Sequence, residues 1–176
     1  VGSEMCIRDR PHDVEGLAKL MGGRRKFVEK LQMVFDEGLY DPANEPDIAY
    51  AYLFSHFRGE EWRTQKETRR LLDKYFTTAP DGIPGNDDTG TMSAWAVFTM
   101  LGLYPDCPGE PYYTLTAPVF DRAEIDTDGG TLVIEKRGEG YIRKMTLGDK
   151  PLTKYRVGHD ELLRGGKLTF ELKNER

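Results

Sequence analysis

The chain has 176 residues, enough for one ordinary domain or for two small layers that share a boundary. Its 30 acidic and 25 basic residues give a net charge of -5, which argues against nucleic-acid or membrane-surface partners and leaves neutral sugars open as ligands. No run approaches the ~20 apolar residues of a membrane span.

The first ten residues fit no element that the pattern predicts. We interpret residues 1–10 as non-native junction sequence and exclude them from the fold. They hold one of the two cysteines, Cys6, and the other is Cys107. The pair forms no metal-ligand pattern, so the prediction is two free thiols.

The first half of the chain predicts helices, because apolar residues recur at a period of 3.6 and glycines or prolines punctuate the runs. The first is capped by Asp13, and the second carries its apolar stripe on Phe27, Leu31, Val34 and Phe35. Between the second and third lies a loop over residues 41–46, which contains two prolines. The predicted helices cover residues 13–21, 24–37, 48–57, 60–76 and 92–101.

A glycine-rich acidic turn over residues 82–91 precedes the last of these helices. Glycine supplies backbone angles that other residues avoid, and proline fixes its own, so the turn can hold a carboxylate in one place. At a helix N-terminus, Asp87 and Asp88 would also meet the positive end of the helix dipole. Taken alone, the pair is better interpreted as helix capping in a surface turn.

After residue 110 the pattern changes to a period of two, which predicts strands. The tripeptide Asp128-Gly129-Gly130 predicts a hairpin between two of them. Because the strands are short, we expect antiparallel pairing in part of a β-sandwich. The predicted strands cover residues 112–117, 124–126, 131–136, 142–147 and 167–172.

Several spaced motifs follow one another in an order that resembles glycoside hydrolase family 92, a family of calcium-dependent, inverting exo-α-mannosidases. The resemblance runs from about Pro11 to near the C-terminus and would make this chain the tail of a longer enzyme. The motifs are Asn44-Glu45-Pro46, Trp62-Arg63-Thr64-Gln65, Asp81-Gly82-Ile83-Pro84-Gly85-Asn86-Asp87-Asp88, Met92-Ser93-Ala94-Trp95 and Leu101-Gly102-Leu103-Tyr104-Pro105-Asp106-Cys107-Pro108-Gly109.

The resemblance implies an α+β fold, in which antiparallel helix pairs from an (α/α)6 toroid are followed by antiparallel β-strands of a sandwich. Residues 11–109 would be the C-terminal part of the catalytic domain, and residues 110–176 would be C-terminal sandwich strands. Their partner strands would come from the N-terminal portion of the same enzyme. That portion is also expected to supply the general acid, a glutamate upstream of Pro11, so the chain alone is expected to be inactive.

The resemblance also assigns site residues. Asp88 takes the place of the general base, and Asn86 would orient the attacking water without sharing the negative charge. Asp87 is assigned to substrate binding. Thr91 stands where many members have glutamine, so the contact that the glutamine makes is not assigned to Thr91.

Calcium is the implied cofactor, and Asn44 and Glu45 are its implied ligands. Their oxygens suit a hard cation, but Ca²⁺ takes about six to eight oxygens, so two side chains cannot hold it alone. By resemblance, the ion would grip vicinal hydroxyls of the terminal mannose. The implied substrate is a mannose-containing glycan such as an N-glycan, and the parent protein would be secreted, periplasmic or on the cell surface.

The remaining aromatic and histidine residues admit two interpretations each. Trp62 is balanced between stacking on a sugar and packing, whereas Trp95 is expected in the core. His56 and His159 have no metal-ligand spacing and are predicted at the surface. The alternative functions are a non-catalytic carbohydrate-binding or interaction module on the same fold, and an (α/α)6 phosphorylase or lyase.

Overall fold

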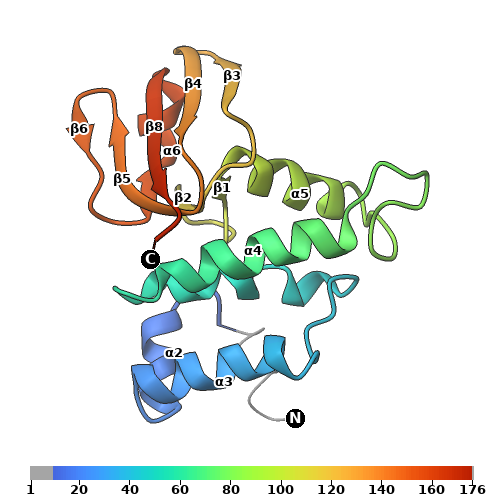
Figure 1. Cartoon of the computed structure of the whole chain (residues 1–176). Coiled ribbons are helices and arrows are strands. Elements are labelled where there is room, and N and C mark those ends of the chain that lie inside the picture. Colours follow the sequence, from blue (N-terminus) through green and yellow to red (C-terminus); the bar gives the residue numbers. More distant parts are fainter. Residues whose placement is uncertain (1–9, 176) are drawn as a thin grey trace. The chain divides into compact units, whose positions relative to one another are not determined.

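The computed structural model describes residues 10–175, and its chain divides into two compact units that we treat separately (Figure 1). Of the described residues, unit 1 comprises 10–96 and 106–108, and unit 2 comprises 97–105 and 109–175. The predicted junction sequence lies outside the described residues, except for Arg10. Cys6 lies outside them too, and Cys107 is buried.

Unit 1 is helical, and its longer helices form where the apolar period predicted them. Asp13 caps the first helix, because its Oδ1 accepts a hydrogen bond from the Gly16 amide at 2.8 Å. The predicted stripe of α3 is buried. The elements are α2 (Val14–Leu20), α3 (Arg24–Asp36), η1 (Glu45–Asp47), η2 (Tyr50–His56), α4 (Glu61–Tyr75) and α5 (Thr91–Leu101), the last of which runs on into unit 2.

The predicted α-helix over residues 48–57 is wrong in type, because Tyr50–His56 forms a 3₁₀-helix. Its first five residues, Tyr50 to Phe54, are all buried. An amphipathic α-helix needs a solvent-facing side, and this run has none, so the 3.6 period was not a reliable guide. The tighter winding places three aromatic side chains in the core of unit 1.

Unit 2 contains two sheets. The smaller has the order β1-β2-β7 and is antiparallel, and the larger has the order β3-β4-β8-β5-β6. The predicted hairpin is confirmed, because Thr127 of β3 pairs with Gly130 of β4. The elements are β1 (Leu103–Tyr104), β2 (Tyr112–Leu115), β3 (Arg122–Thr127), β4 (Gly130–Arg137), β5 (Tyr141–Leu147), β6 (Lys150–Pro151), β7 (Arg156–Gly158), α6 (His159–Leu163) and β8 (Gly166–Lys173).

One strand pair differs from the predicted antiparallel arrangement. Strands β4 and β8 are parallel, with Ile134 opposite Leu168. They can be parallel because β5, β6, β7 and α6 lie between them in sequence, and such a long crossover lets β8 enter the middle of the sheet. The α+β class stands, and the sheet is mixed.

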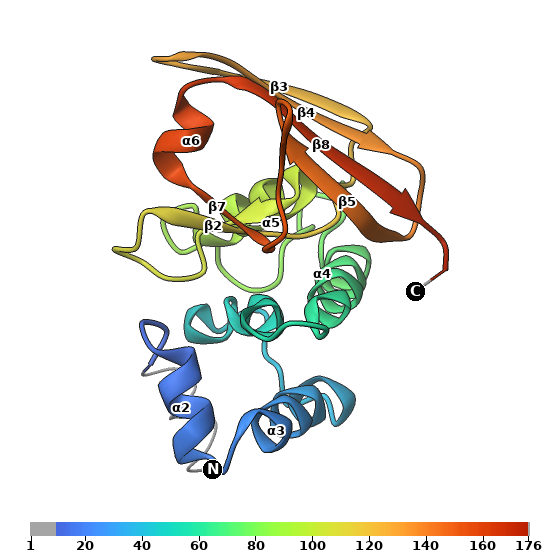
Figure 2. The same ribbon diagram turned by 90° about the vertical axis from the view of Figure 1, so that its left-hand side faces the viewer.

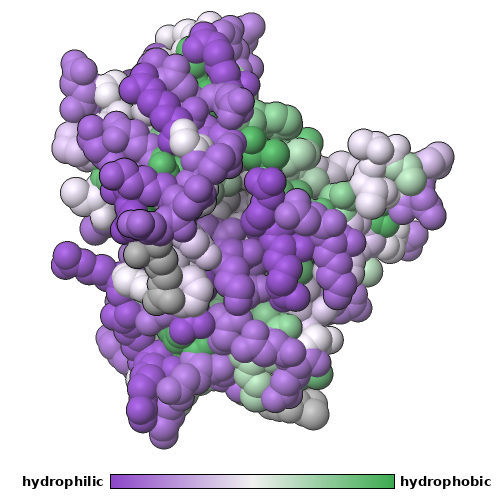
Figure 3. Space-filling model, viewed as in Figure 1, coloured by the Kyte–Doolittle hydropathy of each residue, from purple (hydrophilic) through white to green (hydrophobic). Residues whose placement is uncertain are grey.

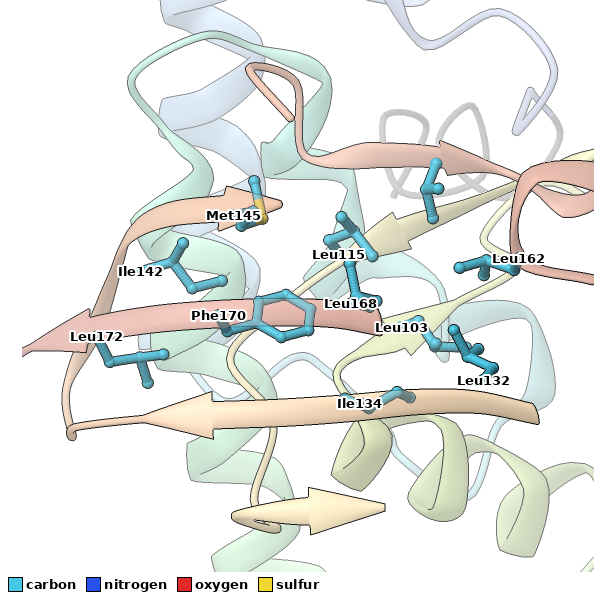
Figure 4. Packing of buried hydrophobic residues seen from close by; sticks show 11 residues of the cluster. Leu103, Leu115, Leu132, Ile134, Ile142, Met145, Leu162, Leu168, Phe170 and Leu172 are labelled. Carbon is cyan, nitrogen blue, oxygen red and sulfur yellow. The ribbon is translucent and has the colours of Figure 1, made fainter. Parts of the chain in front are cut away.

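The two sheets of unit 2 share one hydrophobic core (Figure 4). Leu103, Leu115 and Val157 contribute from the small sheet, which faces the large one in Figure 2. The described chain thus builds two layers of unit 2 itself. Partner strands from the N-terminal portion of the enzyme stay a prediction. The large sheet and α6 contribute Leu132, Ile134, Ile142, Met145, Leu162, Leu168, Phe170 and Leu172.

The opposite face of the large sheet is polar, and the surface over its strands in Figure 3 is mainly hydrophilic. A shallow hollow there is lined by residues such as Arg137, Lys144, Lys167 and Glu171. Most of these charges are paired, for example Lys144 with Glu171 at 3.2 Å. Among the described residues, no helix combines the length and apolar character that crossing a bilayer requires.

Candidate active site

The acidic turn is a strained bend. Asp88 has φ 44° and Thr89 has φ 63°, so two successive residues other than glycine adopt left-handed backbone. Each such residue costs on the order of 1–3 kcal/mol, and Thr89 is β-branched, which makes the conformation rarer still. Strain of this kind persists only where surrounding contacts impose it, and it concentrates at functional sites.

Asp87 supplies those contacts from inside the bend. Its Oδ1 accepts a hydrogen bond from the amide of Ser93 in the first turn of α5 at 2.8 Å. Its backbone carbonyl accepts from the amides of Gly90 at 3.0 Å and Met92 at 3.3 Å. Asp87 therefore satisfies free N–H groups at a helix start, which is the capping role that the turn alone suggested.

Asp88 is exposed at the surface of the bend. Its backbone carbonyl accepts a hydrogen bond from Thr91 Oγ1 at 2.7 Å. Asn86 is exposed as well, two residues away. Thr91, which differs from the glutamine of many family members, thus bonds the start of α5 to the backbone of Asp88.

Residues 41–47, which we call the donor loop because Asn44 and Glu45 could donate oxygen ligands to a metal ion, are held by hydrogen bonds within the loop. Asp41 Oδ1 accepts from the amide of Ala43 at 2.9 Å, and the Asp41 carbonyl accepts from the amide of Asn44 at 3.1 Å. Pro46 lies in the first turn of η1 and stiffens it. Asn44 is half-buried and Glu45 is exposed, so both side chains start from an ordered backbone.

The bend and the donor loop lie against each other. A Cβ placed on Gly85 would be only 2.7 Å from Ala43 Cβ. A second tie joins the elements that follow them, because Trp95 Nε1 on α5 donates to the carbonyl oxygen of Ile48 at 2.9 Å. The structure therefore brings together the segments that carry Asn44, Glu45, Asn86 and Asp88.

The donor loop fits calcium in kind but supplies only part of a coordination shell. An amide oxygen from Asn44 and a carboxylate from Glu45 are hard ligands on a proline-braced turn. Within residues 10–175, no group of three or more histidine, cysteine or acidic side chains gathers where it could hold an ion. Further oxygens would have to come from carbonyl groups, water, the sugar or other parts of the enzyme.

Trp62 occupies a different setting, in the first turn of α4. The guanidinium of Arg63 lies 4.5 Å from the centre of its ring, which is a cation–π distance. Arg63 in turn donates to Gln32 Oε1 at 2.7 Å and to Glu60 Oε2 at 2.8 Å. Trp62 thus lies beside an arginine that joins α3 to the start of α4, and stacking of Trp62 on a sugar stays a prediction.

Glu60 anchors this network. Burial raises the pKa of its carboxyl, but hydrogen bonds from Arg63 and Arg24 outweigh that effect and hold the pKa below its ordinary value. The Arg24 contact is 3.2 Å long. The network therefore relies on an ionised Glu60.

Two histidines lie in hydrogen-bonded settings rather than in solvent. His56 Nε2 is 2.7 Å from Asp106 Oδ2, and the two side chains are 9% and 0% exposed, so the surface prediction for His56 is wrong. His159 Nδ1 is 2.8 Å from the hydroxyl of Tyr113. Sequence patterns could not reveal the His56 pair, because 50 positions separate the partners. Trp95 was correctly predicted in the core.

Comparison with known proteins gives one consistent match. Residues 7–174 match the model of the glycosyl hydrolase family 92 catalytic domain. An "uncharacterized secreted glycosidase" of Arthroderma benhamiae is 34% identical over 173 residues, which covers 94% of this chain and 22% of that protein.

Solved structures agree with that match. A family GH92 alpha-mannosidase from Bacteroides thetaiotaomicron is similar with a TM-score of 0.86 at 28% identity, over 94% of this chain and 24% of that one. A family GH92 inverting mannosidase from the same species gives 0.80 at 29% identity, over 93% of this chain and 26% of that one. The chain thus spans about a quarter of the length of these relatives.

Proposed function

Since this chain belongs to glycosyl hydrolase family 92, we propose that it forms part of the active site of an inverting, calcium-dependent exo-α-mannosidase. The observation that carries the proposal is the strained bend at Asp88 packed against the donor loop. In that arrangement the segment that carries the exposed Asp88 lies against the segment that carries the oxygen donors. An inverting glycosidase needs such a carboxylate to activate water on one face of the sugar.

In this proposal Asp88 is the general base, because Asp87 has one oxygen engaged at the start of α5. Asp88 takes a proton from water as the water oxygen attacks the anomeric carbon. Asn86 makes a hydrogen bond with the same water. Because its amide is neutral, it adds no charge that would alter the basicity of Asp88. Asp87 remains a candidate for a hydrogen bond to the sugar through its second oxygen.

Asn44 and Glu45 would hold calcium, and Trp62 would border the sugar. Bound calcium would draw the sugar hydroxyls into place and favour a distorted ring. The acid that protonates the leaving oxygen is assigned to a glutamate outside these residues, so we expect no turnover by the chain alone. The substrates would be terminal α-mannosides of glycans, and secretion of the enzyme follows the description of the Arthroderma relative.

Chemical rescue tests the base assignment in the full-length enzyme that contains this chain. Asp88→Asn should lower kcat on an activated aryl α-mannoside by about 10²–10⁴-fold. Added azide should restore turnover and yield the β-configured mannosyl azide, because azide needs no base. Asp73→Asn, an exposed acid on α4, is the matched control. Full activity of the Asp88 variant would disprove the proposal.

A further inference from the structure

Gly85 of the bend packs against Ala43 of the donor loop. A Cβ on Gly85 would lie 2.7 Å from Ala43 Cβ and 3.5 Å from its Cα, and real Cβ atoms essentially never approach another heavy atom within 3.0 Å. Gly85 also has φ +69°, which side chains rarely adopt. No methyl group fits between the two segments.

Neither side of this contact can adjust easily. The Ala43 amide donates to Asp41 Oδ1, so the loop backbone is held locally. Ala43 has no side-chain torsion through which its methyl could turn away. On the bend, the Gly82 carbonyl accepts from the amide of Thr77 at 2.8 Å, which anchors the residues before Gly85.

The contact lies between the residues of proposed function. On one chain segment, Ala43 directly precedes Asn44 and Glu45, and on the other, Gly85 directly precedes Asn86 and lies three residues from Asp88. The hydrogen bond from Trp95 to Ile48 holds the flanking elements together. The methyl of Ala43 therefore limits how near the backbone of the bend can come to the backbone of the donor loop.

We propose that Ala43 is a positioning residue that, through Gly85, sets the spacing between the donor loop and the Asp88 carboxylate. This inference rests on the proposed function, and Ala43 itself contacts no reacting atom. A misplacement of the reacting groups by about 1 Å can lower the rate of an enzyme about 10²-fold. A single methyl group added at this contact should therefore lower kcat.

The bend offers a matched control for the test. Gly90 has φ +92° and nothing within 4 Å of an added Cβ, so Gly90→Ala carries the backbone penalty without the clash. Gly85→Ala carries both. Ala43→Gly in the Gly85→Ala background removes the clash and keeps the backbone penalty.

The experiment measures kcat, KM and the calcium requirement of these variants in the full-length enzyme with an aryl α-mannoside. We expect kcat of Gly85→Ala to fall about tenfold or more below that of Gly90→Ala, with the calcium requirement unchanged. The added Ala43→Gly should recover most of that difference. A raised calcium requirement in Gly85→Ala would show that the oxygen donors themselves are disturbed, and it would overturn the inference.

Equal loss in Gly85→Ala and Gly90→Ala, or no recovery with Ala43→Gly, overturns the inference. If Gly85→Ala does not fold, Ala43→Val enlarges the same contact from the other side and must lower kcat relative to Ala43→Ser. The proposed function is tested separately, because it requires Asp88→Asn to lower kcat about 10²–10⁴-fold whatever residue stands at position 43.

Discussion

Thr91 Oγ1 donates a hydrogen bond of 2.7 Å to the backbone carbonyl oxygen of Asp88, across the strained part of the bend. The bond helps to hold Asp88 and Thr89 in left-handed backbone, which neither residue would choose freely. The first residue of α5 thereby holds the backbone that carries the proposed base.

Replacement of Thr91 by valine tests that bond, because valine keeps the shape and removes the hydroxyl. We expect Thr91→Val to lower the free energy of unfolding by about 1 kcal/mol, the usual worth of one hydrogen bond. In the full-length enzyme, kcat should fall and KM should change little. Urea denaturation and steady-state kinetics measure the two effects, and Thr91→Ser, which keeps the hydroxyl, should stay near the parent in both.

The proposed calcium site predicts a metal requirement that depends on Glu45. Chelation of divalent ions should abolish turnover by the full-length enzyme, and added Ca²⁺ should restore it. Glu45→Gln removes the charge of an exposed donor. It should raise the calcium concentration for half-maximal activity about tenfold or more, because a carboxylate binds Ca²⁺ more strongly than an amide.

The matched control for Glu45 is Glu37→Gln, an exposed acid at the end of α3. It should leave the calcium requirement unchanged. An enzyme that works fully in chelator would contradict both the metal assignment and the role of the donor loop.

The buried pair of His56 and Asp106 predicts a large loss of stability on truncation. His56→Ala removes one partner of a hydrogen bond between two side chains that are almost fully buried, and loss of such a partner costs about 1–3 kcal/mol. Thermal or urea unfolding gives the value directly. His12→Ala, at an exposed histidine, should have no measurable effect. A loss for His56→Ala below about 1 kcal/mol would show that the pair contributes little.

The lowered pKa of Glu60 predicts stability that depends on pH. Because the pKa is lower in the folded state, the ionised carboxyl stabilises the fold at pH values above its ordinary pKa. This contribution should be lost as the pH falls from about 4.5 through the folded-state pKa. Glu60→Gln should therefore flatten that part of the stability profile in urea titrations between pH 3 and about 6.

The control for Glu60 is Glu29→Gln. Glu29 pairs with Arg25 at 3.8 Å, and both side chains are largely exposed, so little coupling to folding is expected. If the Glu60 and Glu29 variants gave the same profile as the parent, the ionised network at Arg63 would have no role in stability.

The sequence alone was enough to predict helices and strands that have a solvent-facing side. It was also enough to identify the family. A one-sided apolar pattern exists only where one face meets water, so α3 with its buried Phe27 and Leu31 could be predicted, as could the hairpin at residues 128–130. Where every residue is buried, as from Tyr50 to Phe54, apolar spacing does not distinguish an α-helix from a 3₁₀-helix. The ordered motifs identified the glycosidase family for a similar reason, since local residue identity is what a motif records.

Only the tertiary structure decided which of those residues meet. The parallel pairing of β4 and β8, the burial of His56 against Asp106, and the contact of Ala43 with Gly85 all join positions far apart in the chain. Such contacts depend on how the folded backbone closes its loops, which local spacing does not encode. The different roles of Asp87 and Asp88 also depend on the tertiary structure, because the hydrogen bond from the Ser93 amide engages Asp87.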